Sequence, residues 1–137
     1  MVDLNPNSFK SQSTLKELKL SKNQISFVKD EAFEDLTSLQ ILELQDNVIT
    51  KISSKAFKNV PSLKMLNLSR NGLQDVPSDA LDKLPSLDVL DLSWNYILQI
   101  EDRSFQKQKW LTVLLVSKTQ KFIQSKSNFL KFETDEK

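Results

Sequence analysis

Hydrophobic and polar positions follow one another along this chain in a pattern that returns every 24 residues. The clearest copy is residues 87–97, which read Leu-Asp-Val-Leu-Asp-Leu-Ser-Trp-Asn-Tyr-Ile, or L-x-x-L-x-L-x-x-N-x-I. The first leucine of the pattern stands at Leu15, Leu39, Leu63, Leu87 and Leu111. Self-similarity at a fixed period indicates a repeat array, in which stacked units bury one continuous core. The chain is therefore predicted to be a solenoid.

Each unit opens with an extended segment. Because side chains alternate along a strand, the second and third leucines should point inward and their neighbours outward. The inward pairs are Leu18 and Leu20, Leu42 and Leu44, Leu66 and Leu68, and Leu90 and Leu92. Strands that recur at the same point of successive units stack in parallel, so the pattern predicts a short parallel sheet backed by a wall of leucine.

An asparagine follows each strand, where the chain turns away from the sheet. The column is Asn23, Asn47, Asn71 and Asn95. An asparagine amide both donates and accepts hydrogen bonds, so stacked asparagines are predicted to form a structural ladder by binding the backbone of adjacent turns. Surface turn asparagines are the alternative, which explains the residue type but not the fixed spacing.

The second half of each unit carries an aromatic column. Its members are Phe9, Phe33, Phe57, Phe105 and Phe129, with Leu81 as the one replacement. Phenylalanines in register predict a stacked structural spine along the outer side of the solenoid. Short helical turns are expected after Asp30 and Ser78, and long helices are not.

The full unit, L-x-x-L-x-L-x-x-N-x-I-x-x-I-x-x-x-A-F-x-x-L-x-x, resembles the 24-residue class of animal extracellular leucine-rich repeats. Toll-like receptor ectodomains and small leucine-rich proteoglycans are built from such units. The resemblance covers roughly residues 4–116. It implies an α/β-type solenoid: a leucine-rich repeat arc with a short parallel sheet on the concave face and loops or short helical turns on the convex face. It also implies that ligands often use the concave face.

One domain, residues 1–137, is expected. Its parts are a partial repeat or N-terminal cap at 1–14, full repeats at 15–38, 39–62, 63–86 and 87–110, and a degenerate last repeat with a C-terminal cap at 111–137. The beginning favours a chain cut from a longer array over a cap. The last unit departs from the pattern at Thr119, Lys121 and Gln124. Residues 122–132 are predicted to fold over the open end, with Phe132 in phase with Gln108.

Composition argues against several functions. With 19 basic and 18 acidic residues, the net charge of +1 provides no field that would draw the chain to nucleic acid or an anionic membrane. The chain has neither histidine nor cysteine, so it lacks the commonest metal ligands, the usual general base and the thiol nucleophile. No enzyme activity and no cofactor are expected. The apolar-rich run at 111–116 is too short to span a bilayer.

The outward strand positions form three rows across the predicted concave face. The rows are Glu17, Ile41, Met65, Val89 and Val113; Lys19, Glu43, Asn67, Asp91 and Leu115; and Lys22, Asp46, Arg70, Trp94 and Lys118. Charge alternates between neighbouring strands in the N-terminal half, which is typical of a cross-strand ladder. The C-terminal half is mostly apolar. Its candidate ligand-binding residues are Met65, Val89, Asp91, Trp94, Val113 and Leu115, since aromatic and aliphatic anchors beside a charge resemble a binding hot spot. The alternative for the valines is that branched residues simply suit strands.

Asn67-Leu68-Ser69 is a glycosylation sequon on the same face, although the repeat pattern produces this tripeptide by itself. These features predict a non-catalytic recognition module for a protein or microbial ligand. It would be a segment or soluble relative of an extracellular innate-immune or cell-surface receptor, located outside the cell or at its surface within a longer chain. The alternative is an intracellular, cytoplasmic leucine-rich repeat scaffold for protein–protein interaction, which the missing cysteines favour. Oligomeric state is left open.

Overall fold

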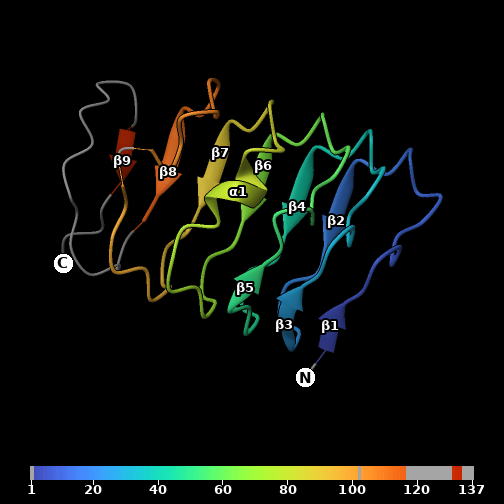
Figure 1. The fold of residues 1–137 in the computed structure, drawn as a ribbon, viewed down its shortest axis with the longest axis horizontal. Helices are drawn as coiled ribbons and strands as arrows, with labels where there is room; N and C mark the ends of the chain where they lie inside the picture. The colour runs from blue at the N-terminus through green and yellow to red at the C-terminus, as the bar shows by residue number, and fades with distance from the viewer. Residues whose placement is uncertain (1, 102, 117–130, 134–137) are drawn as a thin grey trace.

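A six-stranded parallel sheet runs the length of the molecule (Figure 1). The computed structural model describes residues 2–101, 103–116 and 131–133. The strands of this larger sheet are, in order, β2 (Glu17–Lys19), β4 (Ile41–Glu43), β6 (Met65–Asn67), β7 (Val89–Asp91), β8 (Val113–Leu115) and β9 (Lys131–Glu133). From β2 to β8 each residue pairs with the one 24 positions later. The predicted parallel-sheet solenoid and its period are confirmed.

A second, three-stranded parallel sheet follows the first in the N-terminal half, where loops or helical turns were expected. It consists of β1 (Val2–Leu4), β3 (Ile25–Val28) and β5 (Lys51–Ile52), in that order. Branched apolar residues at these positions suit extended backbone. The sheet does not reach the next turn, where Pro77 has no N–H to donate to a strand ladder. A groove of about 570 Å³ lies beside β5 at this point.

The convex side is made of turns with little helix. Helix α1 (Ser78–Leu81) is the only one in the part of the chain that the structure describes, and it begins where a helical turn was expected. After Asp30 the chain forms turns instead of the expected helical turn. No helix among the described residues has the length and apolar character needed to cross a membrane.

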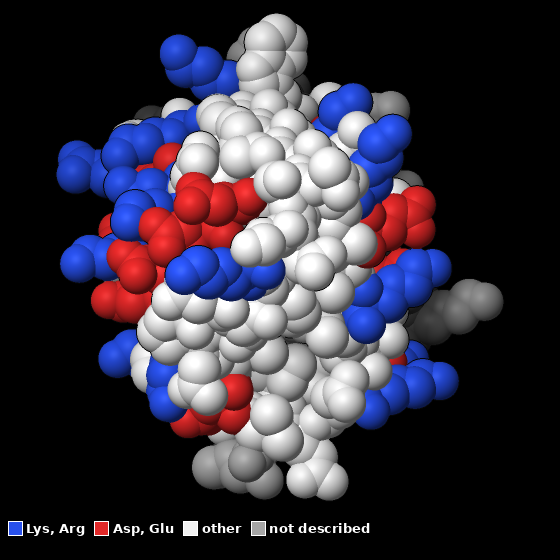
Figure 2. Space-filling model, turned by 90° about the vertical axis from the view of Figure 1, so that its right-hand side faces the viewer, with Lys and Arg blue, Asp and Glu red and all other residues white. Residues whose placement is uncertain are grey.

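The core lies between the larger sheet and the convex turns. Leu42, Leu66 and Leu90 are fully buried behind neighbouring strands. Leu18 and Leu20, their counterparts in the first turn, are only half-buried, because no strand pairs with the outer edge of β2. Figure 2 shows this N-terminal end of the solenoid, where a band of uncharged residues runs between charged side chains on either side.

The aromatic column forms a stack over its first three members. The rings of Phe9 and Phe33 lie 5.6 Å apart and nearly parallel, and those of Phe33 and Phe57 are also 5.6 Å apart. Leu81 ends this stack, and Phe105 beyond it is half-buried. Phe129 lies outside the described residues.

The last strand departs from the 24-residue step. Lys131 pairs with Val113 and Phe132 with Leu114, a step of 18 residues. The expected phase, with Phe132 equivalent to Gln108, is therefore wrong, because the chain returns to the sheet after a shorter outer segment. The rest of the predicted C-terminal cap, at 122–130, lies outside the described residues.

Candidate binding face

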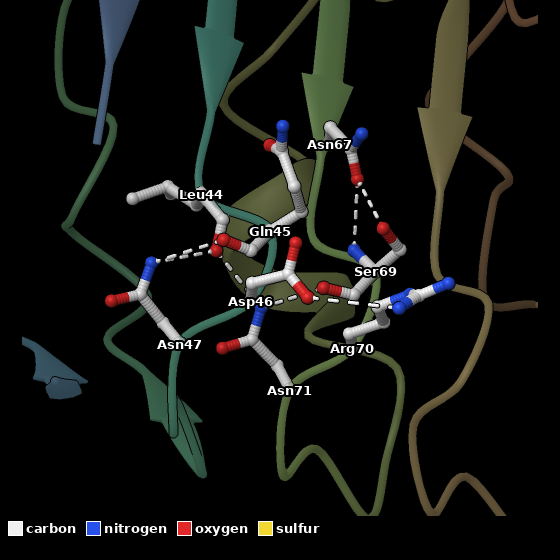
Figure 3. A network of polar contacts seen from close by, with 8 residues as sticks. All are labelled: Leu44, Gln45, Asp46, Asn47, Asn67, Ser69, Arg70 and Asn71. Atoms are coloured by element: carbon white, nitrogen blue, oxygen red, sulfur yellow. Dashed lines mark hydrogen bonds and ion pairs between the residues drawn. The ribbon is translucent and has the colours of Figure 1, made fainter. Parts of the chain in front are cut away.

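A column of buried asparagines fixes the turn after each strand (Figure 3). The Nδ2 group of Asn71 donates to Leu44 O of the preceding turn at 3.0 Å and to Leu68 O of its own turn at 3.1 Å. Its Oδ1 accepts from the N–H of Ile49 at 2.9 Å. Asn47 and Asn95 repeat this arrangement. These bonds hold adjacent turns, and the strands that precede them, in fixed register.

Asn23 belongs to the same sequence column but behaves differently. It is exposed, and its Nδ2 donates only within its own turn, to Leu20 O at 2.9 Å and Ser21 O at 3.0 Å. In the first turn the residue therefore caps its own loop and links no pair of turns.

The outward strand positions meet as the alternation predicts. The strand register brings together Glu17, Ile41, Met65, Val89 and Val113 in one row, and Lys19, Glu43, Asn67, Asp91 and Leu115 in the next. We call the side of the larger sheet that carries these rows the strand-lined face. In the third row, Lys118 lies outside the described residues.

Residues of the third row share an unusual backbone conformation. Lys22, Asp46, Arg70 and Trp94 have φ angles of 55°, 57°, 52° and 57°. Left-handed backbone costs a non-glycine residue about 1 to 2 kcal/mol, and bulky residues are uncommon there. The tight turn explains the angle, but it does not explain a tryptophan.

Ion pairs occupy the N-terminal half of the strand-lined face. Lys19 Nζ lies 4.0 Å from Glu43 Oε1, and Arg70 Nη1 lies 4.0 Å from Asp46 Oδ1. Pairs this exposed contribute at most about 1 kcal/mol each. The Arg70 guanidinium also lies 5.5 Å from the centre of the Trp94 ring, within cation–π range. Arg70 thus connects the charged half of the face to Trp94.

The C-terminal half of the face is apolar and partly exposed. Met65 is 38% exposed and Trp94 45% exposed, while Val89, Val113 and Leu115 are half-buried. We call these five residues the apolar strip.

Two polar side chains beside the apolar strip are oriented by serines. Asn67 Oδ1 accepts from both the N–H and the Oγ–H of Ser69, at 2.9 and 2.7 Å (Figure 3). Asp91 Oδ1 accepts from the same two groups of Ser93, at 2.9 and 2.5 Å. Sequence reasoning missed these serines, although serine recurs two positions before three of the four column asparagines. At the equivalent position Gln45 instead buries an Oε1 atom without a partner among the described residues.

Three large exposed side chains were also missed as site residues. Tyr96 is 70% exposed and Leu98 65% exposed, with Ile97 buried between them, so both continue outward from Trp94 on the flank of the solenoid. Trp110 is 70% exposed on the opposite flank. Comparing equivalent positions between repeats would have found all three. The other repeats carry Gln24, Val48 and Gly72 opposite Tyr96, and Ser26, Thr50 and Gln74 opposite Leu98.

The chemistry of the face is that of contact. Among the described residues no group of three acidic, histidine or cysteine side chains is placed to hold a metal ion. The described groups with clearly shifted pKa values, Asp3 and Lys58, lie in β1 and on the convex side rather than on the strand-lined face. Apolar area with a stacked Arg–Trp pair suits association with another molecule.

Comparison with known proteins gives two findings. A family model described as leucine rich repeat matches residues 1–49 and 37–97. Among solved structures, the leucine-rich repeat domain of APL1B matches with a TM-score of 0.74 and 23% sequence identity, over 85% of this chain and 34% of that chain. The chain thus spans about a third of the length of that structure, and the likeness shows the fold. No curated protein matches the chain.

Proposed function

Because the chain belongs to the leucine-rich repeat family, a fold typical of protein-binding modules, we propose that it is a non-catalytic recognition module whose strand-lined face binds a protein partner. The observation that carries this proposal is the apolar strip. Met65 and Trp94 remain exposed in it although the fold requires neither, since Arg70 occupies the same turn position as Trp94 one repeat earlier.

Trp94 is the expected energetic centre of the interface. Large aromatic side chains near the middle of a contact commonly dominate its binding energy, and Arg70 restrains this ring from one side. A standard interface buries about 800 Å² per partner, while five strands about 4.8 Å apart span only roughly 20 Å. A partner of ordinary size therefore covers most of the face and reaches Tyr96 and Leu98 on the flank.

The test is affinity for a partner recovered by pull-down and measured by calorimetry. Trp94→Ala should weaken binding by about 2 kcal/mol or more, roughly thirtyfold. Trp110→Ala removes an equally large exposed ring from another surface and is the matched control, as is Lys16→Ala at the rim. Both should bind almost as well as the unaltered protein. Unchanged affinity in a Trp94→Ala protein that circular dichroism shows to be folded would move the site to the flank.

We further propose that the module works outside the cell or at its surface, as a segment or soluble relative of an innate-immune or cell-surface receptor for a protein or microbial molecule. The 24-residue repeat pattern and the sequon at Asn67 support this. The comparisons do not single out Toll-like receptors. The cytoplasmic scaffold remains the second candidate, favoured by the absence of cysteine.

Glycosylation of Asn67 separates the two locations. Asn67 is half-exposed in the middle of the strand-lined face, so a glycan there would cover the apolar strip. In cells that make the protein, N-glycosidase should increase its electrophoretic mobility, and Asn67→Gln should abolish that shift. Unglycosylated protein in the cytosolic fraction would favour the scaffold.

A further inference from the structure

An open depression lies at the N-terminal ends of β6, β7 and β8, away from the apolar strip. It has a volume of about 410 Å³ and is lined by Lys64, Ser86, Asp88, Trp110 and Thr112. Small-molecule sites commonly occupy about 300 to 1,000 Å³ and combine an aromatic wall with a few placed polar groups. The depression has both properties.

Trp110 supplies the aromatic wall. Its ring is 70% exposed, although large aromatic side chains are usually buried. The equivalent positions in the other repeats are Thr14, Ser38, Ser62 and Ser86. A small hydroxyl residue therefore satisfies the fold at this point of the turn, and the indole of Trp110 is not needed for packing.

The backbone sets the spacing of the polar side chains. The N–H of Asp88 donates to Lys64 O at 2.9 Å, and the N–H of Thr112 donates to Asp88 O at 2.9 Å. Lys64, Asp88 and Thr112 therefore start from adjacent strands, each about 4.8 Å from the next. The Thr112 hydroxyl donates to Asp88 Oδ1, which orients the carboxylate.

The lining has one positive and one negative side chain, Lys64 and Asp88. A phosphate or carboxylate ligand would be repelled by Asp88, and an organic cation would be repelled by Lys64. A neutral ligand with many hydroxyl groups meets neither repulsion. Its hydroxyls can donate to Asp88, accept from Lys64, and do both with Ser86 and Thr112.

We propose that this depression binds a neutral saccharide. The weakly positive C–H face of a sugar ring would lie against the negative face of the Trp110 indole, with the sugar hydroxyls on Asp88 and Lys64. The site is separate from the strand-lined face, so it stands or falls independently of the proposed protein partner.

The primary experiment is calorimetry of the unaltered protein with four neutral tetrasaccharides, built from glucose, galactose, mannose and N-acetylglucosamine. At least one should bind saturably. The protein has two tryptophans, so Trp94→Phe leaves Trp110 as the only indole. The same sugar should then change the Trp110 fluorescence along the same binding curve.

Variants assign the site. Trp110→Ala should weaken binding about thirtyfold, and Asp88→Asn about tenfold through loss of a charged acceptor. Lys64→Ala should weaken binding, whereas Lys16→Ala, at the same repeat position two turns away, should not. Far-ultraviolet circular dichroism and urea midpoints check that each variant is folded.

Three outcomes would overturn the proposal. They are no saturable binding by any of the four sugars, binding that survives Trp110→Ala, and binding that Lys16→Ala weakens as much as Lys64→Ala. Dependence of a protein partner on Trp110, with no sugar binding, would reassign the depression to a protein interface.

Discussion

Asn47, Asn71 and Asn95 each satisfy three hydrogen-bonding groups of the backbone with one side chain. Each Nδ2 group serves carbonyls of its own and the preceding turn, and each Oδ1 accepts an N–H of the preceding turn. A buried donor or acceptor left without a partner costs about 1 to 3 kcal/mol. The column therefore stabilises the solenoid turn by turn.

Replacing Asn71 by alanine should lower the free energy of unfolding by about 1 to 3 kcal/mol, because it strands the Ile49 N–H and the Leu44 carbonyl. Urea unfolding measures this loss. Gln74→Ala removes an exposed amide three residues later and is the control. Asn59 is unsuitable as a control, since it has a φ of 53° and donates to Asp35 Oδ1 at 2.7 Å. Equal midpoints for Asn71→Ala and Gln74→Ala would contradict the structural role.

At this scale the spacing of the asparagines was readable from sequence, but the left-handed backbone before them was not. Left-handed positions usually announce themselves as glycine or asparagine. Here they carry lysine, aspartate, arginine and tryptophan, chosen for the surface they face. The angle is imposed by the bonds of the following asparagine, and no residue type signals it. The stacking of Arg70 on Trp94 follows from that shared conformation.

Among the elements, β1 is held to β3 by polar side chains as well as by the backbone. Asp3 lies 3.1 Å from Lys29 Nζ and accepts from Ser26 Oγ at 3.0 Å. The hydrogen bond from Lys29, and then that from Ser26, hold the pKa of Asp3 below its usual range. A carboxyl with a lowered folded-state pKa stabilises the fold above its unfolded pKa and loses that contribution as pH falls through the folded value.

Acidification should therefore loosen β1 before the central turns. As the pH is lowered from 6 to below about 4, protection from hydrogen exchange should fall at the Lys29 amide, which donates to Leu4 O at 3.1 Å. The amide of Leu66 in β6 is the internal reference. Asp3→Asn should show weak protection at pH 6 and little further change with pH. A pH response as large as in the unaltered protein would assign the effect to another group.

The elements also show where sequence reasoning stops. Strict alternation of leucine predicted the strands of the larger sheet and their partners. The second sheet was missed because its strands are two to four residues long, and so short an apolar segment fits a turn equally well. The position of β9 was missed because a fixed 24-residue step was extended into a unit that no longer keeps it.

Over the whole molecule, the exposed apolar residues are unevenly distributed. The charged side chains of the strand-lined face pair with one another toward the N-terminal end, whereas Trp94, Tyr96, Leu98 and Trp110 all belong to the last turns. The apolar strip was predicted because the alternation of a strand assigns its residues to one face. Tyr96, Leu98 and Trp110 were missed because they stand on the flanks, where no strand pattern assigns a direction.

The oligomeric state should depend on the C-terminal strand. Strand β9 pairs with β8 and covers its outer edge, and β8 lies in the apolar-rich run Leu111–Val116, which favours extended pairing. Removing residues 122–137 should therefore promote self-association, measured by light scattering. A truncated chain that stays monomeric with an unchanged urea midpoint would show that β9 does not protect the edge.

The bonds between turns have a consequence for how such a chain can be inherited. The Asn71 side chain joins residues 22 and 27 positions before it, and Asn47 and Asn95 repeat those separations. Duplication or loss of one complete unit in the gene preserves every separation, whereas a shift of one residue within a strand turns its inward leucines outward. A point mutation can then add a residue such as Trp110 to one copy while the sister copies continue to maintain the fold.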